Sequence, residues 1–253
     1  MLGSYPLFDS HFHIIEPRFP LVPNQGFIPE AFTCEDYLQR MRLYNLQGGA
    51  IVSGSFQAFD QTYLLDALKT LGKGFVGVTQ VPAETGDEQL AALNDAGVRA
   101  VRFNLKRGGS EEIGQLESMA RRVYEMFRWH VELYVDAVNL SDLKEVLLRL
   151  PAVSIDHLGL SRAGLPIIQN LLEKGVKLKA CGFGRVDFEV KNVLPGLYRI
   201  NPEALMFGTD LPSTRAPRVY TDEDFSLLQD CLQDSSAARA VLAENALRFY
   251  GLA

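Results

Sequence analysis

The chain has 253 residues, of which 47% are hydrophobic and 22% are charged, and this composition is typical of a globular protein with a large apolar core. Its formal net charge of −6 argues against a nucleic-acid-binding protein, since basic pairs such as Lys177 and Lys179 form no stripe and are interpreted as solvent-facing. No apolar run approaches the roughly 20 residues that a membrane-spanning helix requires, which argues against a membrane partner.

The beginning of the chain and its cysteines indicate where the protein works. The first residues, MLGSYPLFDSHFH, carry no basic region before an apolar stretch, so we expect no signal peptide. The three cysteines, Cys34, Cys181 and Cys231, lie far apart and form no CxxC motif. This spacing supports neither a disulfide framework nor a zinc knuckle, and we expect a reducing, cytoplasmic location.

Short β-rich runs alternate with longer amphipathic segments along the whole chain. We predict eight strands, at Leu7–His13, Gly49–Gly54, Phe75–Thr79, Val98–Asn104, Val131–Asp136, Val153–His157, Val176–Cys181 and Leu205–Asp210. Helical spacing is found at Cys34–Leu46, Tyr63–Leu71, Gln89–Ala96, Glu111–Phe127, Leu140–Leu150, Asp222–Leu232 and Ser236–Tyr250. Alternation of this kind predicts parallel pairing, and eight such units predict an α/β fold, a (β/α)8 TIM barrel forming a single domain over residues 1–253. A doubly wound open sheet is the alternative.

The first predicted strand ends in DSHFH at residues 9–13, which holds two of the four histidines. Because side chains alternate along a strand, Asp9, His11 and His13 are expected on one face, with Phe8 and Phe12 on the other. Two imidazoles at the carboxyl end of a barrel strand lie where barrel active sites are built, although a pair of solvent-exposed loop histidines is the alternative. The proline-rich stretch that follows, at 16–32, is long enough that we expect it to be functional.

Two further candidates end later strands. His157 ends the sixth predicted strand in IDHLG, and Asp210 ends the eighth in FGTDLP. Taken alone, His157 could be a hydrogen-bonded core histidine and Asp210 a helix N-cap. A closed barrel, however, brings the carboxyl ends of its strands to one rim. The sequence therefore predicts one site formed by His11, His13, His157 and Asp210.

Five motifs resemble a known family. They are DSHFH (9–13), GVRAVRFN (97–104), HVELYVD (130–136), IDHLG (155–159) and FGTDLP (207–212). In this order, over essentially the whole chain, they resemble the amidohydrolase superfamily. They are most similar to its amidohydrolase family 2 branch, which includes 2-pyrone-4,6-dicarboxylate lactonase and related sugar lactonases. The resemblance implies a barrel hydrolase that acts on a small lactone or ester.

Metal-dependent members of that superfamily usually bind their ion through the first-strand HxH, a fourth-strand lysine or glutamate, later histidines and the eighth-strand aspartate. Here the fourth strand presents Arg102, which cannot deprotonate to become a ligand. His130 begins the fifth strand, about 13 Å from Tyr134 at ~3.3 Å per residue, and we expect it to be a buried structural residue. We therefore expect no required metal cofactor, although a divalent ion such as Zn²⁺ could still be bound by His11, His13, His157 and Asp210.

The predicted reaction is hydrolysis of an ester or lactone bond. We expect Asp210 to act as a general base on water. His11, His13 and His157 are expected to donate hydrogen bonds to the developing oxyanion.

The resemblance also implies substrate-binding residues. Arg102 and Arg185 match substrate-binding arginines, and guanidinium groups bind carboxylates bidentately, so we expect a carboxylate-bearing small molecule. Ser55 aligns with a substrate-contacting serine, and Tyr134 could donate a hydrogen bond to the substrate. In the alternatives, Arg102 pairs with a core acid such as Glu132, Arg185 caps the next helix, Ser55 is a turn serine and Tyr134 only packs.

Three positions near the expected pocket are less certain in role. Phe27 stands where relatives often carry tyrosine, and the missing hydroxyl argues against close mimicry of the pyrone-dicarboxylate substrate. Arg215 and Arg218 lie in the loop after the eighth strand, where they either contribute to the pocket or are solvated.

Two other functions remain open. The same branch includes metal-dependent decarboxylases of small aromatic or unsaturated acids, and a non-catalytic ligand-binding barrel would keep the same residues as relics. Barrels commonly dimerise, so a homodimer is compatible with the sequence, but no stretch marks an interface.

Overall fold

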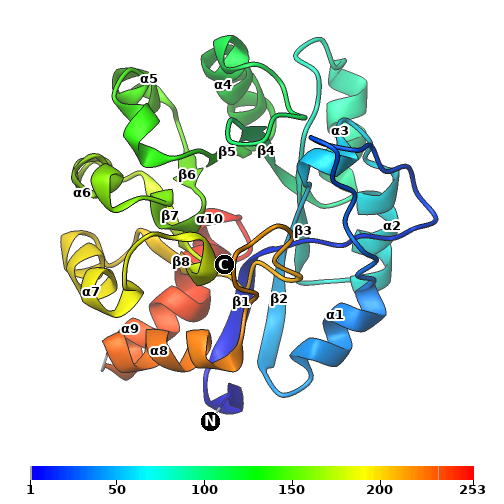
Figure 1. Cartoon of the computed structure of the whole chain (residues 1–253). Helices are drawn as coiled ribbons and strands as arrows, with labels where there is room; N and C mark the ends of the chain where they lie inside the picture. The colour runs from blue at the N-terminus through cyan, green and yellow to red at the C-terminus, as the bar shows by residue number, and fades with distance from the viewer. Residues whose placement is uncertain (1, 233) are drawn as a thin grey trace.

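The computed structural model describes residues 2–232 and 234–253 and forms a barrel of strands surrounded by helices (Figure 1). Neighbouring strands pair in parallel in chain order. At the mouth, Asp210 N donates to the His11 carbonyl and His13 N donates to the Leu211 carbonyl, both at 2.7 Å, which joins the end of the eighth strand to the first. The predicted (β/α)8 barrel is confirmed. The strands are β1 (Pro6–Phe12), β2 (Asn45–Val52), β3 (Phe75–Thr79), β4 (Val98–Asn104), β5 (His130–Tyr134), β6 (Val153–Ile155), β7 (Lys177–Ala180) and β8 (Leu205–Phe207).

Ten α-helices lie in the described ranges, and two of them were not predicted. α6 and α7 follow β6 and β7. α6 has Pro166 in its first turn, where proline is tolerated, and the pattern of α7 is interrupted by Pro195 inside the helix. The predicted tail helix is divided by a π-helical turn, Ala240–Glu244. The helices are α1 (Cys34–Met41), α2 (Thr62–Leu71), α3 (Asp87–Asp95), α4 (Leu116–Phe127), α5 (Lys144–Arg149), α6 (Leu165–Glu173), α7 (Val190–Ile200), α8 (Asp222–Leu232), α9 (Ser235–Arg239) and α10 (Asn245–Phe249).

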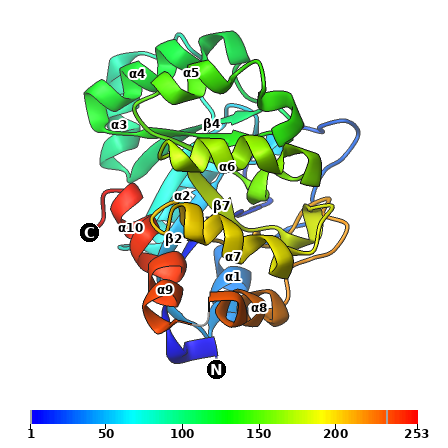
Figure 2. The same cartoon turned by 90° about the vertical axis from the view of Figure 1, so that its left-hand side faces the viewer.

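Apolar side chains fill the end of the barrel opposite the mouth. Phe8 packs there with small and branched residues of the neighbouring strands, including Val52 and Val78, and with Met206 of β8. The carboxyl-terminal helix α10 closes this end, and Tyr250, which follows it, packs its ring 5.5 Å from that of Phe8. Figure 2 shows α10 at one end of the barrel and the loop after β8, in orange, at the other. Any site in the barrel therefore opens only toward the loops of the mouth.

A bulge in β1 changes which of its side chains face the barrel interior. Asp9 pairs with Gly49 and Phe12 with Ile51, so three steps along β1 oppose two along β2. Phe8 consequently faces inward, while Asp9 accepts a hydrogen bond from Tyr37 of α1 and Phe12 stacks on the Tyr37 ring. The prediction that Asp9 shares a face with His11 and His13, with Phe8 opposite, is wrong for Asp9 and Phe8. The extra residue shifts the strict alternation on which the prediction depended.

Gly208 permits the close approach of β8 to β1 beneath the mouth. A Cβ atom at this position would lie 2.7 Å from the backbone nitrogen of His11 and 2.8 Å from its Cβ. We expect Gly208→Ala to lower the free energy of unfolding by about 1–3 kcal/mol, because backbone would have to move. Thermal unfolding measures the loss. Gly196→Ala in α7 is the matched control, since nothing lies within 4 Å of its added methyl group. Equal stability of the two variants would contradict the close approach.

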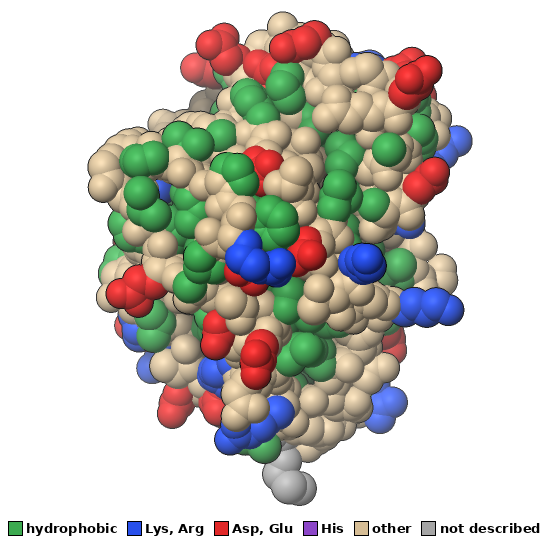
Figure 3. Space-filling model, turned by 90° about the vertical axis from the view of Figure 1, so that its right-hand side faces the viewer, with side chains coloured by type: hydrophobic (Ala, Val, Ile, Leu, Met, Phe, Trp, Pro, Cys, Tyr) green, Lys and Arg blue, Asp and Glu red, His purple; other side chains and the backbone are tan. Residues whose placement is uncertain are grey.

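The face of the molecule shown in Figure 3 has a mixed surface. On the face shown in Figure 3, acidic and basic side chains are interspersed with apolar ones, and neither charge forms a continuous patch. Across residues 2–232 and 234–253, no helix combines the length and apolarity needed to cross a bilayer.

Candidate active site

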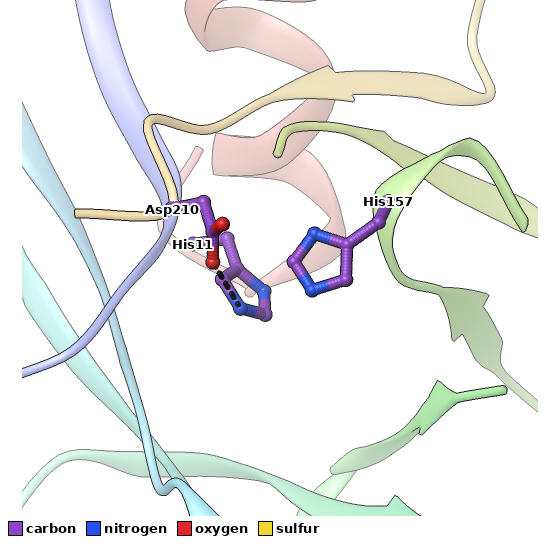
Figure 4. A group of neighbouring side chains, drawn as sticks. All are labelled: His11, His157 and Asp210. Carbon is purple, nitrogen blue, oxygen red and sulfur yellow. Dashed lines mark ion pairs between the residues drawn. The ribbon is translucent and has the colours of Figure 1, made fainter. Parts of the chain in front are cut away.

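The four predicted site residues lie together at the barrel mouth. All are buried, and Nε2 of His11 and Nε2 of His13 lie 3.8 Å and 3.7 Å from Oδ1 of Asp210. The rings of His11 and His157 are 4.8 Å apart between centroids. Figure 4 shows the His157 ring directed toward His11 and Asp210 from the opposite side of the mouth. The barrel thus brings residues 11, 13, 157 and 210 within reach of one small molecule.

Two of these residues lie just beyond their strands. β6 ends at Ile155 and β8 at Phe207, so His157 and Asp210 belong to the turns that follow, not to the strands as predicted. Both have left-handed backbone conformations, with φ of 52° at His157 and 60° at Asp210. Such φ values are uncommon outside glycine and concentrate at functional sites, and aspartate tolerates them better than most residues.

Asp210 is ion-paired with Arg185. Nε of Arg185 donates to Oδ2 of Asp210 at 2.6 Å, and Nη2 donates to the Thr214 carbonyl at 3.0 Å. Burial alone would raise the pKa of Asp210, but the Arg185 guanidinium, together with the neighbouring histidines, outweighs this and holds the pKa well below its usual range. Arg185 therefore does not cap the next helix. It keeps the candidate base ionised.

Arg102 pairs with Asp156, not with Glu132. Its Nη2 donates to Oδ2 of Asp156 at 2.8 Å, and its Nη1 donates to the Ser53 carbonyl at 2.8 Å. Both side chains are almost fully buried. Sequence reasoning missed Asp156, although a charged residue directly before His157 in an apolar run was a usable signal.

A second buried cluster lies beneath the histidines, toward the centre of the barrel. Lys179, which we had interpreted as solvent-facing, is fully buried and donates to Glu132. That prediction is wrong because the inward face of β7 lies inside the closed barrel. Glu132 also contacts Nε2 of His130 at 3.0 Å and accepts from the Tyr250 hydroxyl at 2.6 Å. The location of His130 as a buried residue is confirmed.

Two adjoining cavities form the space above the histidines. The inner cavity, about 30 Å³, is lined by all four predicted substrate-binding residues, Arg102, Arg185, Ser55 and Tyr134. The outer cavity, about 240 Å³, shares Tyr134, Arg185, Arg107 and Arg215 with it. Among the described residues, Arg107 and Arg215 have no carboxylate within ion-pairing distance. The pocket is therefore cationic, which suits an anionic ligand.

The proline-rich loop and the eighth loop meet over this pocket. Arg215 donates to Asn24 Oδ1 at 2.9 Å and to Ser55 Oγ at 3.0 Å, and its guanidinium lies 4.7 Å from the Phe27 ring centroid. Arg218 instead pairs with Asp224 at 2.7 Å. Arg215, not Arg218, thus contributes to the pocket.

The mouth has the donor types of a divalent-metal site. Ligand atoms of His11, His157 and Asp210 lie within 4.8 Å of one another, and Nε2 of His11 and Oδ1 of Asp210 are buried without a hydrogen-bond partner among the described residues. Two imidazole nitrogens and a carboxylate oxygen suit an ion such as Zn²⁺. His13, which the sequence included among the possible ligands, lies outside this group on distance, although its Nδ1 donates to the Val52 carbonyl at 2.7 Å and its Nε2 lies 3.7 Å from Oδ1 of Asp210.

Comparison with known proteins gives consistent matches. The amidohydrolase family model, Amidohydro_2, matches residues 8–252. A 2-pyrone-4,6-dicarboxylate hydrolase of Comamonas testosteroni is 32% identical over 157 residues, 60% of this chain and 51% of that protein. The chain thus aligns with about half the length of that relative.

Two further matches extend over almost the whole chain. A 4-sulfomuconolactone hydrolase of Hydrogenophaga intermedia is 24% identical over 96% of this chain and 88% of its own. The crystal structure of a probable 2-pyrone-4,6-dicarboxylic acid hydrolase from Acinetobacter baumannii, with citric acid bound, superposes with a TM-score of 0.84 at 22% identity. That alignment covers 97% of this chain and 99% of the other, and it supports the fold.

Proposed function

This chain belongs to the amidohydrolase family, and from that membership we propose that it hydrolyses a small anionic lactone or a related ester. The observation that carries the proposal is the convergence of His11, His157 and Asp210 beside a cavity lined by arginines. The names of the two curated relatives, both lactone or pyrone hydrolases, support the same reaction class. An inner cavity of about 30 Å³ has room for roughly two waters, so the substrate ring would extend into the outer cavity.

Asp210 is the proposed general base. Its Oδ1 carries no hydrogen bond in the described structure and faces the two first-strand histidines, so a water in the cavity could donate to it. The ion pair with Arg185 keeps Asp210 ionised but also weakens it as a base. A substrate carboxylate that binds Arg185 would share the guanidinium charge and thereby strengthen the base.

Proton positions divide the three histidines into two roles. His13 donates through Nδ1 to a carbonyl, so Nε2 is the ring nitrogen left to accept the second hydrogen of the water. His157 Nδ1 lies 3.2 Å from the Cys181 sulfur, and burial raises the pKa of that thiol, which therefore keeps its proton. We assign the thiol as the donor to Nδ1, an arrangement that leaves the proton of His157 on Nε2. We therefore assign oxyanion stabilisation to His11 and His157, a refinement of the three equal donors predicted from sequence.

The buried charges at the mouth are already balanced. Three cations, Arg102, Lys179 and Arg185, lie among three carboxylates, Glu132, Asp156 and Asp210, whose pKa values are all lowered. Burial lowers the pKa of His11 to about 4 and holds that of His157 well below its usual value, so both rings are neutral near pH 7. A divalent ion would add two uncompensated charges to this site, which is why we propose that none is required. If one were bound by His11, His157 and Asp210, it would polarise the carbonyl and acidify a water.

A screen of lactones and esters by proton release, with and without chelator, tests the reaction class. We expect turnover of a carboxylate-bearing lactone that a chelator does not abolish, and much weaker turnover of its neutral methyl ester, because the cavity is cationic. Loss of activity on chelation, restored by Zn²⁺ or Mn²⁺, would contradict the metal-free proposal. Release of CO₂ from a hydroxybenzoate would favour a decarboxylase, and binding without turnover would favour a non-catalytic barrel.

A further inference from the structure

Lys179 of β7 is a fully buried lysine at the centre of the barrel, directly beneath the candidate catalytic histidines. Its ammonium group donates to Oε2 of Glu132 and lies 3.5 Å from Nδ1 of His11 and 3.9 Å from Oδ1 of Asp156. The ring of Tyr250 lies below it, with the centroid 5.8 Å from Nζ. These four groups come from β5, from β1, from the turn after β6 and from the residue that follows α10, and they converge on the ammonium.

The same three partners have the composition of a metal site. Ligand atoms of His11, Glu132 and Asp156 lie within 4.8 Å of one another, and all three residues are buried. Lys179 Nζ is within 3.9 Å of an atom of each, so the position that an ion would take is filled by a protein cation. An ammonium is a compact charge with three donors and no acceptor.

That donor-only character favours one proton position on His11. Nδ1 of His11 has two polar neighbours, Oδ1 of Asp156 at 3.4 Å and Nζ of Lys179 at 3.5 Å. A proton on Nδ1 would be donated to Asp156, as the hydrogen bond between these two side chains requires, whereas toward the ammonium of Lys179, which can only donate, Nδ1 accepts. In the second arrangement the single proton of the neutral imidazole is on Nε2, the atom that faces Asp210 and the mouth.

We propose that Lys179 is a positioning residue that replaces a divalent ion among His11, Glu132 and Asp156 and holds His11 in the tautomer whose Nε2–H faces the cavity. In this tautomer His11 can donate to an oxyanion but cannot offer Nε2 to a metal, since a ligating nitrogen must be unprotonated. Lys179 thus favours metal-free chemistry in two ways: it occupies the position of an ion, and it keeps a proton on the His11 nitrogen that faces the cavity. The catalytic consequence rests on the proposed hydrolysis, whereas the tautomer and the cation site do not.

The tautomer is measured directly by ¹⁵N NMR of histidine-labelled protein, with His11 assigned from a His11→Asn sample. We expect Nε2–H at His11 in the native protein and Nδ1–H, facing Asp156, in Lys179→Met. Lys177→Met is the matched control, because Lys177 lies two residues earlier on β7 and donates only to the Glu203 carbonyl. Nδ1–H at His11 in the native protein would overturn the proposal.

Metal content is the second measurement. After equilibration with Zn²⁺ and dialysis, we expect Lys179→Met to retain about one additional equivalent relative to the native protein and to Lys177→Met, because the two carboxylates lose their resident cation. Unchanged metal content in folded Lys179→Met would contradict the replacement of an ion.

The double variant Lys179→Met/Glu132→Gln removes one positive and one negative charge, so the buried charges stay balanced. It replaces Lys179→Met in these measurements if Lys179→Met does not fold. We expect it to be stable, to show the altered His11 tautomer, and to bind no additional Zn²⁺. On a lactone that the native protein hydrolyses, kcat should fall about 100-fold with little change in KM, the loss typical of one oxyanion donor. Native kcat in the double variant would show that Lys179 only offsets Glu132, which would overturn the positioning role. If no lactone is hydrolysed, the NMR and metal measurements still test the His11 tautomer and the replacement of an ion by Lys179.

Discussion

Asp210→Asn is expected to lower kcat for the hydrolysed lactone by about 10²- to 10⁴-fold, the range that a general base contributes. The amide cannot take a proton from water, whereas it matches the carboxylate in size. Asparagine also tolerates the left-handed backbone conformation at this position, where φ is 60°. The backbone hydrogen bond from residue 210 to His11 that helps to close the barrel is unaffected by the change. Steady-state kinetics, with thermal unfolding to verify the fold, measure the effect.

The control for this variant is Asp222→Asn at the start of α8. Asp222 also pairs with an arginine, Arg40, but on the outside of the barrel and partly exposed. The two substitutions remove the same charge from the same kind of pair, so any loss of kcat found only at position 210 reflects its place at the mouth. Full activity of Asp210→Asn, or a change confined to KM, would exclude the role of general base.

Arg102→Leu is expected to destabilise the fold strongly, by about 3–5 kcal/mol, because it leaves the buried Asp156 carboxylate without its main partner. The guanidinium donates to Asp156 through both Nε and Nη2, and it also satisfies the Ser53 carbonyl. Denaturant unfolding measures the loss. Combining Arg102→Leu with Asp156→Asn should recover part of it, since the neutral amide needs no counter-charge.

The comparison at the surface is Arg149→Leu. Arg149 pairs with Glu117 on the outside of the barrel, and exposed ion pairs contribute little to stability. If Arg102 served mainly to bind substrate, as the family resemblance implied, its replacement would raise KM. The free energy of unfolding would then stay close to that of Arg149→Leu. The predicted order, a large stability loss for Arg102 and a small one for Arg149, therefore separates the two roles.

The eight strands and the residues at their carboxyl ends were predictable from local patterns. Apolar runs bounded by turn residues indicate strands, and in a parallel barrel the end of each strand lies at one rim whatever the details of packing. This is why His11, His13, His157 and Asp210 could be assigned to one site from positions nearly 200 residues apart. Helix α7 was not predicted because Pro195 interrupts its pattern, and the short helix α6 was not predicted either.

The charge partners were not predictable in this way. For Arg102 the alternative to substrate binding was a pair with Glu132, which lies opposite it in the β4–β5 register, but its guanidinium pairs with Asp156 after β6. Arg185 caps no helix and pairs with Asp210, while it still lines the cavity. In each case the partner depends on how far along the barrel axis each side chain lies and on the direction in which it points. Strand pairing alone specifies neither.

From sequence alone, then, come the barrel, its mouth and the identity of the four polar groups there, because these depend on short-range periodicity and on a rule common to all parallel barrels. Tertiary structure decided the rest: the β1 bulge that turns Asp9 outward, the pairing of each arginine, and the burial of Lys179 beneath His11. These features depend on contacts among residues distant in the chain, in an interior where an unpaired charge is so costly that every cation must find a carboxylate.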